Sequence, residues 1–248
     1  MTGRGGAVVT GAARGIGAAT ARRLHEDGYA VVALDLDGDA LAQAWAGEEV
    51  ACVVGDAADP AAIEDAIAAA PQPLRVYVAN AGATRNGPAI GYPRVEWDRL
   101  LEVHLTGAFE GARHAAAAMG EAGGSIVCTA SIAALQGFAA RPAYSAAKAG
   151  IVGLVRSLAV EWAPRGIRVN AVVPGYVATD IVRETVRRGF VDEAALRRRI
   201  PLGRLGEPAQ IADAIAFLAS ERAAYVTGVA LPVDGGWSAF GLGETTDA

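Results

Sequence analysis

Ala7-Val-Val-Thr10, followed directly by Gly11-Ala-Ala-Arg-Gly15-Ile-Gly17, indicates the fold class most directly. The first four residues are β-prone and indicate a short strand. A glycine-rich turn follows, and a helical pattern then runs to about Leu24. Glycines let a backbone approach a pyrophosphate, and a helix N-terminus offers N–H donors and positive potential. The stretch therefore predicts a phosphate-binding unit, with G-x-x-x-G-x-G spacing in place of the commoner G-x-G-x-x-G.

A second apolar run, Ala30 to Leu34, ends in Asp35, which lies 18 residues beyond Gly17. In dinucleotide-binding folds, an acidic residue at about this distance accepts hydrogen bonds from ribose hydroxyls. The alternative is that Asp35 caps a turn or a helix. The glycine motif favours the first interpretation without excluding the second.

Short apolar runs alternate with helical patterns along the chain. We predict strands at 6–10, 30–35, 50–54, 75–79, 124–130, 167–172 and 229–233. We predict helices at 15–27, 38–46, 60–70, 96–120, 142–163, 180–199 and 208–219. This alternation predicts an α/β fold, a doubly wound Rossmann-type parallel sheet of about seven strands with helices on both faces. No linker divides 1–248, so we expect one domain, with 241–248 as a loose tail.

Composition narrows the class of protein. Of the 248 residues, 52% are apolar, enough for a substantial core. We expect neither a membrane span nor a signal peptide, since no long apolar run lacks a charge and the first strand begins within a few residues of the start. The net charge of −5, with both signs interspersed, indicates no nucleic-acid partner. Cys52 and Cys128, both in apolar strand-like runs, predict two buried free thiols and a reducing cytoplasm; no metal site is expected.

Ser131, Tyr144 and Lys148 are the candidate chemical groups. Ser131 ends an apolar run, and Tyr144 and Lys148 share one face of a predicted helix, four residues apart. A nearby ammonium lowers the pKa of a phenol, and a hydroxyl at the strand end can orient a carbonyl or alcohol oxygen. The alternative for the Tyr-x-x-x-Lys pair alone is a solvated helix face. With the other motifs, the three predict a general acid–base site for carbonyl/alcohol interconversion.

With these motifs the chain resembles the short-chain dehydrogenase/reductase family, in its single-domain branch of about 250 residues. The resemblance runs from about Gly6 to Trp237. It includes the glycine turn, Asn80-Ala-Gly82, the 13-residue gap from Ser131 to Tyr144, and Pro174-Gly175. It implies that the cofactor is bound by Gly11, Arg14, Gly15, Ile16, Gly17, Asp35, Asp56, Ala57, Asn80, Ala81, Gly82, Tyr144, Lys148, Pro174, Gly175, Val177 and Thr179.

The resemblance also implies the catalytic roles. Tyr144 would exchange a proton with the substrate oxygen, Ser131 would orient that oxygen, and Lys148 would bind the nicotinamide ribose and lower the pKa of Tyr144. One position departs from the family pattern, because His104 stands where an Asn supports a water that leads protons to the Lys. His104 either takes over that role or is a hydrogen-bonded core histidine.

We expect NAD as the cofactor. Asp35 would repel a 2′-phosphate and Asp37 adds negative charge, whereas Arg14 in the glycine turn favours NADP by resemblance. The predicted function is hydride transfer between NAD(H) and a secondary alcohol or ketone. The alternatives are an NADPH-dependent 3-oxoacyl-thioester (acyl-carrier-protein) reductase and a regulator without turnover. The resemblance further implies a homotetramer or dimer, joined through the helices near 96–120 and 142–163.

Two further stretches bear on the substrate. By resemblance, the substrate pocket would be shaped by Leu135 to Phe138, Arg141, Tyr176 and 181–202. Much of this set is apolar. Arg141 would either pair with a substrate carboxylate or lie at the surface. The arginine-rich stretch, Arg187-Arg188 and Arg197 to Arg199, indicates a solvated helix face or part of a lid rather than a polyanion site.

Overall fold

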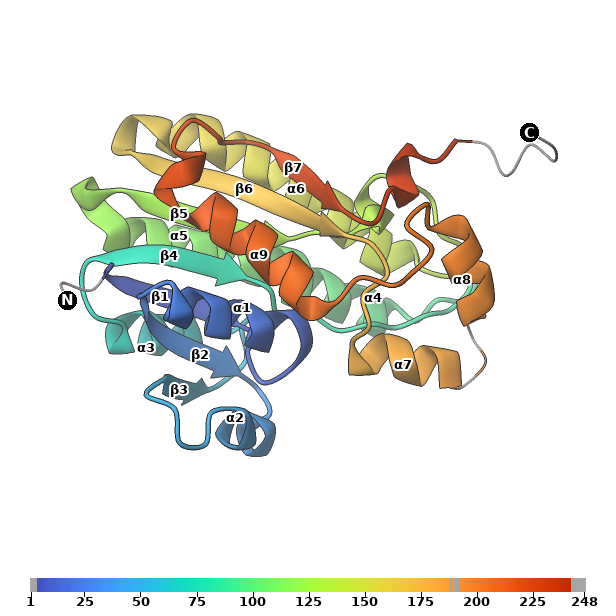
Figure 1. The fold of residues 1–248 in the computed structure, drawn as a ribbon, viewed down its shortest axis with the longest axis horizontal. Helices are drawn as coiled ribbons and strands as arrows, with labels where there is room; N and C mark the ends of the chain where they lie inside the picture. The colour runs from blue at the N-terminus through green and yellow to red at the C-terminus, as the bar shows by residue number, and fades with distance from the viewer. Residues whose placement is uncertain (1–3, 188, 190–191, 242–248) are drawn as a thin grey trace.

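The computed structural model describes residues 4–187, 189 and 192–241 (Figure 1). Within them the chain forms a parallel seven-stranded sheet in the order β3-β2-β1-β4-β5-β6-β7. The strands are β1 (Gly6–Thr10), β2 (Ala30–Asp35), β3 (Ala51–Val54), β4 (Leu74–Ala79), β5 (Gly124–Thr129), β6 (Ile167–Pro174) and β7 (Ala230–Val233). The predicted Rossmann-type sheet is therefore confirmed.

The helices cover both faces of the sheet (Figure 1). They are α1 (Gly15–Glu26), α2 (Gly38–Ala44), α3 (Pro60–Ala69), α4 (Arg94–Leu101), α5 (Gly107–Met119), α6 (Pro142–Trp162), α7 (Asp180–Arg187), α8 (Glu193–Arg199) and α9 (Pro208–Ala219). One hydrophobic core lies between the sheet and α1 and α9, and the other lies between the sheet and α3, α5 and α6. The central strands have nearly continuous apolar sequences because helices cover the sheet on both faces.

The strand order reverses between β1 and β4, which are neighbours in the middle of the sheet. From this point β2 and β3 extend to one side, and β5, β6 and β7 extend to the other. In open α/β sheets a crevice forms at such a reversal, beyond the carboxyl ends of the strands. The connections that leave these ends hold all of the sequence motifs above.

Two predicted helices are corrected by the structure. The stretch 96–120 contains α4, then a π-helical turn at Glu102–Thr106, then α5. Such turns interrupt regular helices, often at functional sites, and this one contains His104. The stretch 180–199 holds two helices, α7 and α8, instead of one. Gly189 lies between them with a φ of +71°, a conformation that lies outside the right-handed helical region and favours glycine.

The prediction of two buried thiols was half wrong. Cys128 is buried in the central strand β5, but Cys52 is exposed. The reason is that Cys52 lies on β3, which is the last strand at one edge of the sheet and has little cover. An apolar run alone does not distinguish an edge strand from a central one. The predicted loose tail, from residue 242 on, lies outside the described residues.

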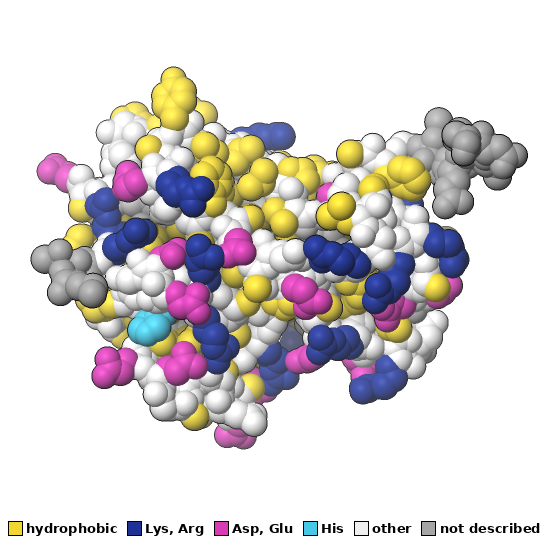
Figure 2. All heavy atoms as spheres, viewed as in Figure 1, with side chains coloured by type: hydrophobic (Ala, Val, Ile, Leu, Met, Phe, Trp, Pro, Cys, Tyr) yellow, Lys and Arg dark blue, Asp and Glu magenta, His cyan; other side chains and the backbone are white. Residues whose placement is uncertain are grey.

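Of the described helices, α6 is the one whose length and apolar composition would allow it to cross a membrane. It instead packs on β6, with Ile151, Val155 and Leu158 buried in the core beneath the sheet. A core helix of this length passes the same compositional test. Figure 2 shows acidic and basic side chains interspersed over the face that carries α1 and α9.

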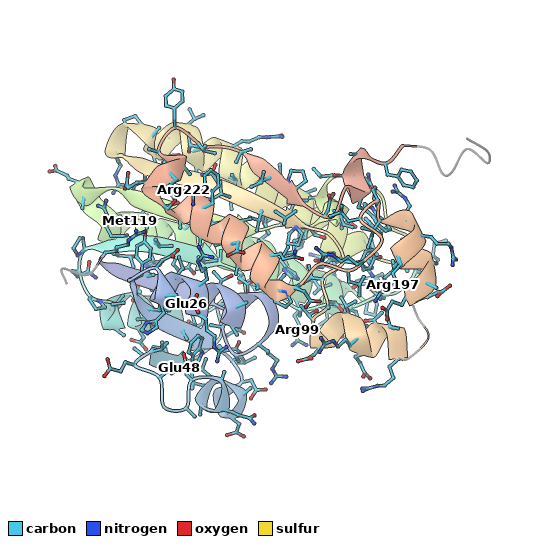
Figure 3. All side chains as sticks on the ribbon, viewed as in Figure 1. Glu26, Glu48, Arg99, Met119, Arg197 and Arg222 are labelled. Carbon is cyan, nitrogen blue, oxygen red and sulfur yellow. The ribbon has the colours of Figure 1, made fainter. Side chains whose placement is uncertain are left out.

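The arginine-rich stretch is divided between two helices: Arg187 ends α7, Arg197 to Arg199 end α8, and Arg188 lies outside the described residues. Of the three arginines of α8, two face solvent. Arg197 pairs with Glu193 at 2.6 Å and projects outward from α8 (Figure 3). Arg198 lies 4.0 Å from Asp192. Arg199 differs, because its guanidinium donates to the backbone carbonyls of Trp237 and Phe240. The stretch is thus a largely solvated helix face that also holds the C-terminal segment.

Candidate active site

Side chains from β1, β4 and β5 join the strand ends at the switch point. The Thr10 hydroxyl accepts hydrogen bonds from the backbone N–H groups of Asn80 and Ala81, both at 3.0 Å. The Asn80 amide donates to the carbonyls of Thr10 at 3.0 Å and Gly11 at 3.3 Å. Its carbonyl oxygen accepts from the Thr129 hydroxyl at 3.3 Å. Asn80 therefore fixes the strand ends at the border of the pocket.

The glycine turn forms a cradle that has no room for side chains. A Cβ on Gly11 would lie 2.9 Å from Ala81 Cα, and a Cβ on Gly17 would lie 1.9 Å from the Gly11 carbonyl oxygen. Gly11 and Gly15 have φ values of +65° and +57°, which favour glycine. The N-terminus of α1 beside the turn has no side-chain cap and no acidic residue in its first turn. These free N–H donors suit a pyrophosphate, so the residues present fit a dinucleotide.

Charged side chains at one end of the pocket are paired with each other or with the backbone. Asp35 accepts hydrogen bonds from the backbone N–H groups of Ala13 at 2.9 Å and Asp37 at 3.0 Å. Arg14 forms an ion pair with Asp37, which also caps α2 by accepting from Ala40 N. Asp35 thus supports the turn, as its alternative interpretation had it, while still lining the pocket. Each carboxylate oxygen has further acceptor capacity for a ribose hydroxyl.

Ser131, Tyr144 and Lys148 meet at the other end of the same pocket. Ser131 follows β5, and its hydroxyl accepts from Ala133 N at 3.2 Å. Tyr144 and Lys148 come from the first two turns of α6. The Lys148 ammonium lies 5.7 Å from the centre of the Tyr144 ring and donates to the Thr129 carbonyl at 2.6 Å. The spacing in the sequence therefore brings the three groups together as predicted.

Burial changes the proton affinities of these groups. It lowers the pKa of Lys148 to about 8, because a buried ammonium loses its hydration. It raises the pKa of Tyr144, and the Ser131 hydroxyl and the Arg141 charge offset this only in part. The net direction for Tyr144 is the reverse of the lowering expected from Lys148. Desolvation of the phenolate outweighs the favourable neighbours in the protein without cofactor.

His104 is buried within the π-helical turn and directly contacts the site. Its Nε2 lies 2.7 Å from the Ala83 carbonyl oxygen and 3.2 Å from Ala83 N, and the shorter contact favours the tautomer in which Nε2 donates to the carbonyl. Its ring packs edge-on against Tyr144 with 5.2 Å between the centroids. Burial and the Lys148 charge lower the pKa of His104 to about 3, so the ring is neutral. With Nε2 on the Ala83 carbonyl, Nδ1 is buried without a hydrogen-bond partner. A cavity of about 10 Å³ lies between His104, Thr129 and Lys148.

The pocket has a volume of about 660 Å³, within the range of sites for cofactors and small ligands. Its lining includes most of the residues predicted from the sequence: Gly11, Arg14, Gly15, Ile16, Asp35, Asn80, Ala81, Gly82, His104, Ser131, Tyr144, Lys148, Pro174, Gly175, Val177 and Thr179.

Three of the predicted residues do not line this pocket. Gly17 lies beneath the turn, where it is needed for close packing. Asp56 is exposed and accepts a hydrogen bond from Ala58 N at 2.9 Å. Ala57 packs against Gly107 and lines the small cavity instead. The loop after β3 therefore lies outside the large pocket.

Sequence reasoning missed some of the lining residues. They include Thr84 and Asn86, in the loop after β4, and Asp180, the first residue of α7. Thr84 and Asn86 directly follow the Asn80-Ala-Gly82 motif, so their position after a strand end was an available signal. Val182 and Thr185 of α7 also line the pocket, and they belong to the stretch 181–202 that was expected by resemblance to shape the substrate pocket.

A parallel sheet with a glycine-turn pocket at its switch point defines a dinucleotide-binding enzyme of the Rossmann class. The model of a family described as enoyl-(acyl carrier protein) reductase matches residues 11–238. A cis-4-hydroxycyclohexanecarboxylate dehydrogenase from Sinomonas cyclohexanicum is 46% identical over 245 residues, covering 94% of this chain and 96% of that protein.

Solved structures agree with these matches. An oxidoreductase of the short-chain dehydrogenase/reductase family from Burkholderia thailandensis has a TM-score of 0.87 at 37% identity, covering 94% of this chain and 92% of that chain. A protein from Agrobacterium tumefaciens, provisionally described as 2-deoxy-D-gluconate 3-dehydrogenase and solved with bound NADP, has a TM-score of 0.84 at 36% identity over 94% and 96% of the two chains.

The chain belongs to the short-chain dehydrogenase/reductase family, which confirms the resemblance found in the sequence. It is an NAD(P)-dependent oxidoreductase that acts on CH–OH groups of small molecules.

Proposed function

We propose that this enzyme transfers a hydride between NAD(H) and a secondary alcohol or ketone, with Tyr144 as the general acid and base. The observation that carries the proposal is the meeting of Ser131, Tyr144 and Lys148 at one end of the pocket that has the glycine turn and Asp35 at the other. The nicotinamide supplies the hydride chemistry when bound. The chain's own groups hold the reactants and move the proton.

The proton moves through the phenol of Tyr144. Because burial raises its pKa, Tyr144 is protonated near neutral pH and is ready to donate to a ketone oxygen. In the oxidation direction, the phenolate accepts the alcohol proton. Ser131 holds the same oxygen through its hydroxyl, and the Lys148 ammonium binds the nicotinamide ribose and favours the phenolate once the cofactor excludes water.

His104 takes over the role of the usual Asn in this proposal. Its Nδ1 is buried without a hydrogen-bond partner, and the residue lines a small cavity together with Lys148. That volume is close to the least that holds one water molecule, and a water needs at least two polar neighbours. A neutral imidazole that accepts through Nδ1 can orient a water toward Lys148, and its low pKa keeps it neutral over the working range.

The preference for NAD rests on Asp35 and Asp37. A carboxylate beside the adenosine ribose accepts hydrogen bonds from hydroxyls and repels a phosphate. Arg14 could bind a phosphate, but its guanidinium is paired with Asp37. The alternative is an NADPH-dependent 3-oxoacyl-thioester reductase, and the presence of Arg14 at the pocket favours it. The regulator without turnover is disfavoured by the complete Ser131, Tyr144 and Lys148 set.

Assembly, domain organisation and location are part of the same proposal. We propose a homotetramer or dimer built through α4, α5 and α6, supported by exposed Val95, Phe109 and Val160 on these helices. Residues 1–248 would form one domain. Two free cysteines support a reducing cytoplasm as the location. Size-exclusion chromatography with light scattering tests the assembly.

The test is steady-state hydride transfer, followed at the absorbance of the reduced nicotinamide. Secondary alcohols, sugars and hydroxy acids are screened with NAD and NADP in parallel, and ketones and 3-oxoacyl thioesters with the reduced forms. Turnover of a secondary alcohol with NAD supports the proposal. Turnover only with NADP(H) and a thioester supports the alternative. Intact binding of cofactor without turnover of any substrate class would favour the regulator.

A further inference from the structure

Arg141 lies in the pocket rather than at the outer surface. It is the N-cap residue of α6, three positions before Tyr144, and both side chains line the pocket with Ile132, Tyr176 and Val182. Its guanidinium stacks over the Phe138 ring at 5.7 Å from the centroid. A ring face does not accept hydrogen bonds from the N–H groups that lie in the plane of the guanidinium, so these donors remain available to a ligand.

Within the described part of the chain, the Arg141 guanidinium makes no hydrogen bond or ion pair, and only the backbone carbonyl of Arg141 is engaged, accepting from Ser145 N at 2.9 Å. The acidic residues that line the same pocket are engaged elsewhere. Asp35 accepts from backbone N–H groups, Asp37 pairs with Arg14, and Asp180 lies 3.8 Å from Arg183. The catalytic end of the pocket therefore has a half-buried cation whose counter-charge the protein does not supply.

The backbone before Arg141 is held in an unfavourable conformation. Ala140 has a φ of 60°, and no other non-glycine residue in the described ranges has a positive φ. Side chains with a Cβ rarely adopt this region, and such residues gather at active sites and ligand clamps. The Ala140 carbonyl accepts from Gly87 N at 2.8 Å, which joins this turn to the loop after β4. The surrounding structure thus holds Arg141 in place.

The beginning of α6 adds positive potential at the same point. The helix has 21 residues, no side-chain cap on its N-terminal N–H groups and no acidic residue in its first turn. Unsatisfied N–H groups at a helix N-terminus attract negative charge. The positive end of the helix and the unpaired guanidinium reinforce each other beside Tyr144.

We propose that Arg141 binds a carboxylate on the substrate, so that the enzyme acts on a hydroxy acid or keto acid. This inference rests on the proposed function, because it identifies the substrate class of that site. Arg141 immediately precedes α6, Tyr144 lies in its first turn, and both side chains line the same pocket. The carboxylate is therefore separated from the reacting carbon by a short carbon skeleton, which the apolar Ile132 and Val182 would contact.

This geometry also separates the two candidate substrate classes. In an acyl thioester, the charged phosphates lie at the far end of a long pantetheine arm, away from the reacting carbonyl. A hydroxy acid has its charge close to the reacting carbon, where Arg141 lies. The Arg141 charge also lowers the pKa of Tyr144, so a carboxylate that neutralises this charge would raise the pKa and make the phenolate a stronger base for alcohol oxidation.

Ligand binding tests the inference without requiring turnover. Cyclohexanecarboxylate and cyclohexanecarboxamide have the same skeleton, differ in charge and have no alcohol or ketone to react. Their affinities for the NAD-loaded enzyme are measured by titration calorimetry with the original protein, Arg141→Gln, Arg141→Lys and the control Arg85→Gln. Arg85 lies in the neighbouring loop, pairs with Glu96 and does not line the pocket.

We expect the original protein to bind the carboxylate about 10- to 100-fold more tightly than the amide, as for a charge-assisted hydrogen bond. Arg141→Gln should lose this advantage, Arg141→Lys should retain part of it and Arg85→Gln all of it. Equal affinity for the two ligands, or an advantage that survives Arg141→Gln, overturns the inference. The comparison of the two ligands in the original protein stands even if a variant fails to fold.

The same measurements distinguish failure of the inference from failure of the proposed function. If hydroxy acids and their neutral amides are oxidised equally well, the dehydrogenase remains and the role of Arg141 is overturned. If the carboxylate binds selectively through Arg141 but no alcohol or ketone is turned over, the subsite is supported and the proposed function fails.

Discussion

The two ends of the pocket are built in opposite ways. At the end with Asp35, Arg14 and Asp37, the charges are accessible to water and paired within the protein. At the end with Tyr144 and Lys148, the polar groups are poorly hydrated and their pKa values are shifted. The end with Asp35, Arg14 and Asp37 can select between cofactors by repelling a group of the wrong charge. At the end with Tyr144 and Lys148, burial disfavours the charged forms of both side chains, and a bound cofactor and substrate can change this balance.

The comparison predicts that changes at the buried end affect the chemical step, whereas changes at the paired end affect the choice of cofactor. Four experiments test this division, in order of decreasing effect.

Tyr144→Phe removes the proton donor at the buried end and preserves the ring that packs on His104. We expect kcat to fall about 10²- to 10⁴-fold, the usual contribution of general acid–base catalysis. NADH affinity, measured by fluorescence titration, should change little. A variant that keeps most of its kcat would remove Tyr144 from the mechanism.

Asp35→Ala removes the carboxylate at the paired end. We expect the ratio of kcat/KM with NAD to that with NADP to fall about 10- to 100-fold, because charged hydrogen bonds to the ribose and the repulsion of a phosphate are both lost. Asp35→Asn retains one acceptor oxygen, so its NAD/NADP ratio should lie between that of the original protein and that of Asp35→Ala. An unchanged ratio in both variants would contradict the assigned role of Asp35.

The pH dependence of turnover reports on the buried end. Oxidation needs the Tyr144 phenolate, and burial raises its pKa, so kcat/KM for an alcohol should rise about tenfold per pH unit below neutrality. The rise should weaken near pH 8, where Lys148 loses its proton. Ketone reduction should be nearly independent of pH over the same range, because the phenol is already protonated below its raised pKa. Profiles measured in both directions test this, and a flat oxidation profile would count against a titrating phenol.

Asp37→Asn is the finest test of the paired end. An amide retains the cap on α2, which Asp37 provides through Ala40 N, and removes the charge that holds Arg14. Since exposed ion pairs contribute little, we expect the use of NADP to rise only a few-fold relative to NAD. Arg14→Gln in the same background should reverse the gain. If NADP use is unchanged, the pair does not control cofactor choice.

Local patterns in the sequence were sufficient for the architecture. The strand at Gly6–Thr10, the glycine turn and the helix at Pro208–Ala219 follow from periodicity and from turn chemistry, which act over a few residues. The four-residue spacing of Tyr144 and Lys148 placed them on one helix face for the same reason. Parallel strands end at one edge of the sheet, so motifs at those ends meet in a single pocket.

Long-range partners were not predictable in this way. Cys52 is exposed because β3 is an edge strand, and edges are set by strand order. The Ala83 carbonyl at His104 Nε2 comes from another loop. The direction of the pKa shift of Tyr144 depends on how much water the folded chain removes from the phenol.

The parallel sheet, the family and the group of residues at the switch point could be predicted from the amino-acid sequence, because they depend on periodicity, spacing and order along the chain. The pairing of charges in the pocket could be read only from the folded structure. Arg14 is neutralised by Asp37, which is 23 positions away, whereas Arg141 is left unpaired beside Tyr144. Pairing and desolvation depend on distances through space, and those distances are set when the whole chain packs.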